Sequence, residues 1–140
     1  MTTANKGAHM LQISGIDHLN LNIVNLDKSI EFYNKVLGFE IKEEGTSPSG
    51  SPYAIIGSSE RAYLCLYQNL ESPLSEDRDK RYLNHLGFNI TNFDDVKKSL
   101  KELGVNIDLE YGYENSRSIY ITDPNGLEIE LSEKFGGGLH

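Results

Sequence analysis

The sequence predicts an α+β fold made of two βαβββ modules, whose strands form a curled mixed sheet with the helices on its outer face. The strongest observation is an internal repeat. Displaced by 67 residues, the segment HLNLNIVNLD that begins at His18 matches HLGFNITNFD, which begins at His85, at six of ten positions. The second observation is that each copy continues with helical periodicity and then with three short strand-like runs.

The first module opens with apolar residues at every second position, a period typical of a half-buried strand. A helix is expected next, because Asp27 lies at or next to a suitable N-cap and Gly38 lies where a residue of positive φ ends a helix. Three strands separated by Gly, Pro and Ser complete the module. The predicted strands are 19–23, Phe39–Glu44, Tyr53–Gly57 and Ala62–Gln68.

The second module repeats this order. Its helix has Asp94 at or next to the N-cap and Gly104 after its last turn. The predicted strands are 86–90, Asn106–Glu110, Arg117–Thr122 and Leu127–Ser132.

The chain length of 140 residues suits a single domain. We place this domain at residues 11–134, with module one at 11–68, a linker at 69–81 and module two at 82–134. Residues 1–10 and 135–140 are predicted to be flexible tails.

The composition excludes several classes of partner. Thirteen Lys and Arg against 21 Asp and Glu give a net charge of −8, which repels nucleic acid. No apolar run approaches the roughly 18 residues that a membrane span needs. The single cysteine, Cys65, and a start without secretory-signal features favour a cytoplasmic location. We therefore expect a small-molecule substrate.

Strand parity divides the side chains of each module between two faces, because the alternating apolar residues must pack under the helices. The opposite, open face carries His18, His85 and the carboxylate of Glu130. Two imidazoles and a carboxylate are the ligand set of metal sites that keep open coordination positions. Further candidate site residues on or near this face are Asn20, Tyr63, Cys65, Tyr67, Tyr113 and Tyr120.

Each candidate also has an ordinary structural interpretation. A single strand histidine is more often hydrogen-bonded than a ligand, and a lone glutamate is more often solvated. The metal-site interpretation depends on all three groups sharing one face of a duplicated unit. Cys65 is expected to be a packing residue. The tyrosines are as well suited to lining the walls of a pocket as to taking part in the reaction. Arg117 is a candidate for binding an anionic group of the substrate. However, parity places it on the face opposite Tyr120, and an arginine at such a position is more often an ordinary surface residue.

Three segments, GIDHLNLNIVNLDKSIEFYNKVLGFEI, YLNHLGFNI and SIYITDPNGLEIELSE, resemble the vicinal oxygen chelate superfamily over Leu11–Lys134. This superfamily includes glyoxalase I, fosfomycin-resistance enzymes, extradiol dioxygenases and bleomycin-binding proteins. The resemblance implies that His18, His85 and Glu130 hold one divalent metal per site, which could be Zn, Ni, Mn, Co or Fe. It also implies a homodimer with two sites, because the modules must face each other within one chain or between chains.

The resemblance leaves the reaction open. We expect a glyoxalase-like enzyme of lyase, isomerase or thiol/epoxide transferase type, with Glu130 as a possible base and Tyr120 orienting the substrate or donating a proton. The alternatives are an Fe(II) extradiol-type dioxygenase and a protein that only binds a small aromatic or cationic compound. The resemblance also implies that the fourth metal ligand of glyoxalase I, a glutamate in the last strand of the first module, corresponds to Cys65 here. This difference argues against an isomerase that uses two glutamates. Glu110 and Glu114 stand where a phosphonate would favour positive charge, so a substrate other than fosfomycin is expected.

Overall fold

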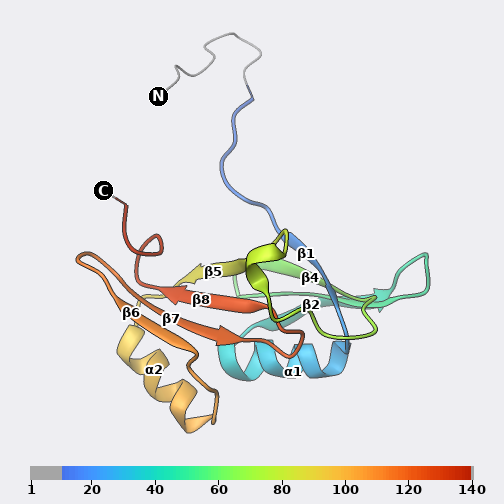
Figure 1. Cartoon of the computed structure of the whole chain (residues 1–140). Helices are drawn as coiled ribbons and strands as arrows, with labels where there is room; N and C mark the ends of the chain where they lie inside the picture. Colours follow the sequence, from blue (N-terminus) through green and yellow to red (C-terminus); the bar gives the residue numbers. More distant parts are fainter. Residues whose placement is uncertain (1–10, 140) are drawn as a thin grey trace.

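The computed structural model describes residues 11–139; the predicted N-terminal tail, residues 1–10, and His140 lie outside the described residues (Figure 1). The elements of module one are β1 (Leu19–Ile23), α1 (Leu26–Leu37), β2 (Glu40–Thr46), β3 (Pro52–Gly57) and β4 (Ala62–Gln68). A 3₁₀ turn, η1 (Arg78–Lys80), interrupts the linker. The elements of module two are β5 (His85–Asn89), α2 (Phe93–Glu102), β6 (Leu109–Gly112), β7 (Arg117–Thr122) and β8 (Glu128–Ser132).

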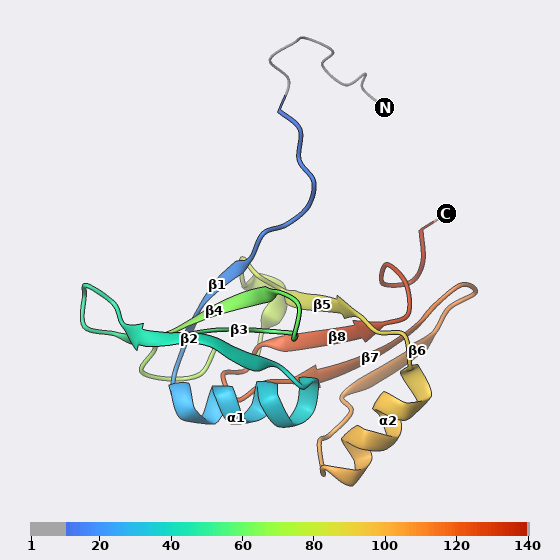
Figure 2. The same cartoon turned by 180° about the vertical axis from the view of Figure 1, so that it is seen from behind.

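The strands form two four-stranded mixed sheets, in the orders β1-β4-β3-β2 and β5-β8-β7-β6. In each sheet the first strand pairs with the last in parallel, and the other neighbours are antiparallel. Figure 2 shows both helices on the same side of the two sheets. The predicted βαβββ repeat is therefore confirmed. The expectation of one curled sheet around a metal cavity is corrected, because within a single described chain the two sheets do not join edge to edge.

Both helices end where the sequence predicts, at glycines in the left-handed region, with φ of 70° at Gly38 and 72° at Gly104. Their N-caps, however, are asparagines. The side chain of Asn25 accepts a hydrogen bond from the Lys28 backbone N–H, and Asn92 holds the same place in α2. The aspartates of the repeat lie in the first turns, where they favour the positive end of the helix dipole.

The helix-facing residues form the core, as parity predicts. The most deeply buried apolar side chains of the sheets include Ile23, Ala54, Ile56, Leu64, Leu66, Ile119, Ile121, Ile129 and Leu131. The strand predicted at Asn106–Glu110 instead begins at Leu109. Asn106 donates a side-chain hydrogen bond to Asp108, which also accepts one from Thr122, and such local bonds compete with strand pairing.

The β7–β8 turn ties the two modules together. Tyr33 of α1 donates a 2.7 Å hydrogen bond to Asp123 Oδ2, and Asn125 donates from Nδ2 to Ser29 Oγ at 3.1 Å. Asn125 Oδ1 accepts from the backbone N–H of Val24 at 2.8 Å. All of these side chains except that of Val24 are buried. Burial and the Asp123 carboxylate raise the pKa of Tyr33 well above its usual value.

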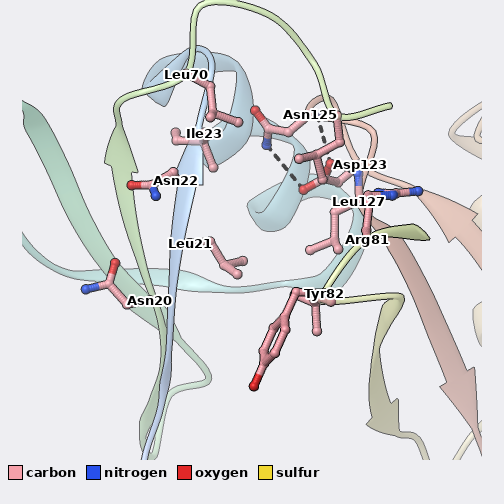
Figure 3. Close-up of a pocket in the computed structure, with 12 residues that line it drawn as sticks. Asn20, Leu21, Asn22, Ile23, Leu70, Arg81, Tyr82, Asp123, Asn125 and Leu127 are labelled. Atoms are coloured by element: carbon pink, nitrogen blue, oxygen red, sulfur yellow. Dashed lines mark hydrogen bonds between the residues drawn. The ribbon is translucent and has the colours of Figure 1, made fainter. Parts of the chain in front are cut away.

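A hollow of about 340 Å³ lies beside this turn, between β1, the linker and module two (Figure 3). Its walls include Leu21, Ile23 and Leu127, with the Asp123–Asn125 contact at its upper edge. No histidine lines it, so it does not contain the predicted metal site. Within residues 11–139, no helix is long and apolar enough to cross a bilayer.

Candidate metal centre

His85 and Glu130 meet on the open face of module two. They lie on the parallel strands β5 and β8, in which Gly87 is the register partner of Glu130. His85 Nε2 is 3.0 Å from Glu130 Oε1. The Glu130 side chain is only 8% exposed, and a hollow of about 420 Å³ opens over the pair. Two of the three predicted ligands are thus brought together.

The contact between His85 and Asn84 indicates which ring nitrogen of His85 carries the hydrogen. Asn84 Nδ2 contacts the Arg78 carbonyl and the Asp79 carboxylate, which orients its amide so that Oδ1 faces His85. His85 Nδ1 therefore carries the hydrogen and donates it to Asn84 Oδ1 at 2.7 Å. In the neutral ring, the Nε2 lone pair then faces a carboxylate oxygen. Two electron-pair donors this close require a cation or a proton between them.

A hydrogen bond to Oε2, the second carboxylate oxygen, orients the side chain of Glu130. Ser118, on the neighbouring strand β7, donates a 2.7 Å hydrogen bond to Oε2. This bond leaves Oε1 directed toward His85. Residues 135–139, predicted as a free tail, fold back nearby, with the Gly136 carbonyl 3.4 Å from the Ser118 hydroxyl.

Tyr120 stands directly opposite Glu130 in the β7–β8 register, and its ring lies edge-on to His85 with centroids 5.5 Å apart. Burial is the main cause that raises the pKa of Tyr120, and the charge and hydrogen bonding of Glu130 add to it. The phenol is therefore protonated at neutral pH and available as a donor.

His18 lies just before β1, and its Nδ1 is 2.6 Å from Asp17 Oδ2. Because a carboxylate accepts, Nδ1 carries the hydrogen and Nε2 is free for a metal. Across the described residues 11–139, however, no three His, Cys, Asp or Glu side chains are placed to share an ion. The expectation that one chain could complete the site by itself is therefore not met.

Asn20, Cys65 and Tyr67 lie on the sheet of module one, where Asn20 is the register partner of Cys65. Tyr67 stacks on Tyr53 with centroids 5.3 Å apart. Burial is the largest cause that raises the pKa of the Cys65 thiol, followed by the charges of Asp17 and Glu43. Cys65 is therefore protonated at neutral pH, which suits the expected packing role better than a nucleophile.

Tyr63 departs from the expected open face. The β3–β4 register shifts between Ile56 and Gly57, so Tyr63 lies at a bulge. Its ring stacks on Phe39 at 5.6 Å and meets Phe88 of module two at 6.0 Å. Tyr63 thus packs in the junction between the modules.

The guanidinium of Arg117, predicted as a candidate for an anionic substrate group, is engaged by acidic side chains of the chain itself. It lies on the helix side, where it makes a two-point contact with Glu133, pairs with Asp94 of α2 and covers the ring of Phe93 at 4.3 Å. Glu110 also faces the helix side and pairs with Lys97 at 2.9 Å. This placement removes Glu110 from the argument against a phosphonate substrate.

Several contributors were missed by sequence reasoning. Tyr111, which lies between the predicted Tyr113 and Tyr120, completes an aromatic row with centroids 5.9 and 6.0 Å apart. Arg78 pairs with Glu128 and lies over the Tyr120 ring. Parity could have identified Tyr111, whereas the position of Arg78 in the linker has no periodic signal. The residues that orient the two histidines did have a sequence signal. The repeat aligns Asp17 with Asn84, so that a hydrogen-bond acceptor precedes each histidine.

Comparison with known proteins settles the family. The model of the Glyoxalase/Bleomycin resistance protein/Dioxygenase superfamily matches residues 15–131. The chain belongs to this superfamily. The metallothiol transferase FosB of Staphylococcus epidermidis is 36% identical over 123 residues, covering 85% of this chain and 83% of the relative. FosB of Staphylococcus haemolyticus is 35% identical with the same coverage.

A solved superfamily member shares the fold. The fosfomycin resistance protein FosX from Listeria monocytogenes, crystallised with Mn(II) and sulfate, superposes with a TM-score of 0.68 at 22% identity, over 89% of this chain and 96% of that one. Together, these findings confirm the family resemblance and the expectation of an enzyme of this superfamily.

Proposed function

We propose that this superfamily enzyme is a divalent-metal-dependent thiol transferase, which adds a thiol to a small epoxide such as fosfomycin. The observation that carries the proposal is the convergence of His85 Nε2 and Glu130 Oε1 in an oriented pair whose carboxylate is buried. The FosB relatives supply the reaction type. The metal would be held by His85 and Glu130 of one copy and His18 of a second copy.

The donor set fits a metal. Ligand atoms about 2.1 Å from one ion and at right angles to each other lie about 3.0 Å apart, which is the separation found here. In both histidines the partner group is on Nδ1, which directs the Nε2 lone pair of the neutral ring toward a metal, and Ser118 fixes the glutamate. Zn, Ni, Mn, Co and Fe all accept these ligands, so the donor set does not select the ion.

In the proposed reaction, the sulfur of a thiolate co-substrate attacks an epoxide carbon. The C–S bond forms as the C–O bond breaks, and the bonding pair moves to the oxygen, which then takes a proton. A bound divalent metal would supply Lewis acidity for the developing oxyanion. Tyr120 is the chain's own donor toward that oxygen, because its raised pKa keeps the phenol protonated.

Two copies are proposed because one described chain holds two ligands together but not the third. The module that carries His18 would face the His85–Glu130 pair of the partner copy. A homodimer would then have two equivalent sites.

The experiment mixes two inactive variants, His18→Ala and His85→Ala, after joint unfolding and refolding. If sites are shared, half of the dimers are mixed and each has one intact site, so about a quarter of wild-type thiol transfer returns. Titration calorimetry with Mn²⁺ and Zn²⁺ should show one ion per chain in wild type. A wild type that binds no metal would exclude the proposed chemistry and favour the binding-protein alternative, whereas zero complementation would exclude only the shared site.

A further inference from the structure

Arg78 is the positive charge placed nearest the Tyr120 side of the His85–Glu130 pair, and it is already neutralised. Its guanidinium lies over the Tyr120 ring and pairs with Glu128. A phosphonate dianion would have to compete with Glu128 for this group. A cation supplied by module one would face no such competition in the proposed site.

Arg61, in the β3–β4 turn of module one, has different partners. Its Nη2 donates to the backbone carbonyls of Ile16 at 3.2 Å and Asp17 at 3.0 Å. Its guanidinium carbon lies 4.7 Å from the centre of the Tyr63 ring. These contacts fix the group without cancelling its charge, and within the described part of the chain no carboxylate lies within 4.0 Å of it.

Arg61 also lies next to His18, the proposed metal ligand of module one. The two carbonyls that it binds belong to the residues immediately before His18, and Arg61 and His18 line one hollow of about 330 Å³. Because these contacts lie within module one, Arg61 stays beside His18 whichever copy supplies His85 and Glu130.

We propose that Arg61 binds the phosphonate or phosphate group of the substrate. This inference rests on the proposed function. The Nη1 amino group has no hydrogen-bond partner among the described residues, so a guanidinium edge remains for an oxyanion. The substrate would then lie between Arg61, which comes with His18, and Tyr120, which comes with Glu130.

The test compares Arg61→Ala and Arg61→Lys with Lys98→Ala, which removes one exposed positive charge from α2. In steady-state transfer of a thiol to fosfomycin, Arg61→Ala should raise KM about ten- to a hundredfold with little change in kcat, because a hydrogen-bonded charge contact is lost. Arg61→Lys should recover part of this loss, since it keeps the charge without the planar fork. Lys98→Ala should behave as wild type.

A second readout does not require turnover. Binding of methylphosphonate to the wild-type protein is measured by calorimetry, with Mn²⁺ affinity measured on the same samples. Arg61→Ala should weaken methylphosphonate binding by a similar factor and leave Mn²⁺ affinity unchanged. Equal methylphosphonate binding by wild type and Arg61→Ala, or none by wild type, would overturn the role of Arg61. Unchanged KM for fosfomycin in Arg61→Ala would overturn it too, while the thiol transferase proposal would stand.

Discussion

The two modules share one topology but differ at matched positions of their open faces. Asn20 pairs with Cys65 in module one, and the repeat aligns Asn20 with Gly87, which pairs with Glu130 in module two. Cys65 therefore occupies the position of Glu130. One strand further, Ile55 stands where Tyr120 does. At these two positions module two carries a carboxylate and a phenol, whereas module one carries a thiol and an aliphatic side chain.

The matched turns differ as well. The β7–β8 turn, with Asp123 and Asn125, is buried against α1, whereas the β3–β4 turn leaves Glu60 and Arg61 exposed. The helix-facing sides of both sheets stay apolar because close packing tolerates few changes there. The open faces and turns are free of that constraint, so one scaffold can divide a site into unequal halves.

The difference between the two open faces is tested most directly by substituting Glu130 and Cys65, which occupy equivalent positions in the two modules. Glu130→Gln should lower Mn²⁺ affinity more than about 100-fold, because it removes an anionic ligand and not only its support. Cys65→Ser should leave affinity close to wild type. Calorimetry on both variants checks this, with circular dichroism to confirm folding. Similar losses in both variants would mean that module one also contributes its β4 side chain to the metal.

The sequence was sufficient for much of this arrangement. Alternation is set by strand geometry, so parity correctly placed Glu130 and Tyr120 on one face and Arg117 on the other. Tyr63 was misplaced because a bulge breaks alternation, and a bulge has no sequence period. Whether His18 reaches His85 depends on how whole modules pair, which no local pattern determines.

The buried link between the modules is the second point of comparison, since module one has no equivalent at its own β3–β4 turn. Tyr33→Phe removes a buried hydrogen bond to Asp123 and should lower the free energy of unfolding by about 1–3 kcal/mol. Urea unfolding at pH 7 measures this. Tyr82→Phe, at a fully exposed tyrosine at the start of module two, is the matched control and should have no effect.

The same variant should change the response to alkali. The pKa of Tyr33 is raised in the folded protein, so its contribution is fully present below the unfolded value of about 10 and is lost as pH rises through the higher folded value. Wild type should therefore lose stability above pH 10 more steeply than Tyr33→Phe. Equal slopes would show that the Tyr33 phenol titrates normally in the folded state.

The smallest expected effect concerns how each module supports the start of its helix. In module one, Gln68 accepts a hydrogen bond directly from the first backbone N–H of α1, at Leu26. In module two, the matched residue Glu133 acts through Arg117, which reaches Asp94 in the first turn of α2. Glu133→Gln would make the second module resemble the first, with a modest loss of stability at neutral pH, because partly exposed ion pairs contribute little.

This substitution should be most visible in acid. The hydrogen bond from Arg117 lowers the pKa of Glu133, so the folded state favours the charged carboxylate. Its contribution is present above the unfolded value of 4.5 and is lost as pH falls through the lower folded value. Urea unfolding of wild type and Glu133→Gln from pH 7 to pH 3 should give curves that converge at the acid end. Curves that stay parallel would show that the Arg117 contact contributes nothing that depends on the charge of Glu133.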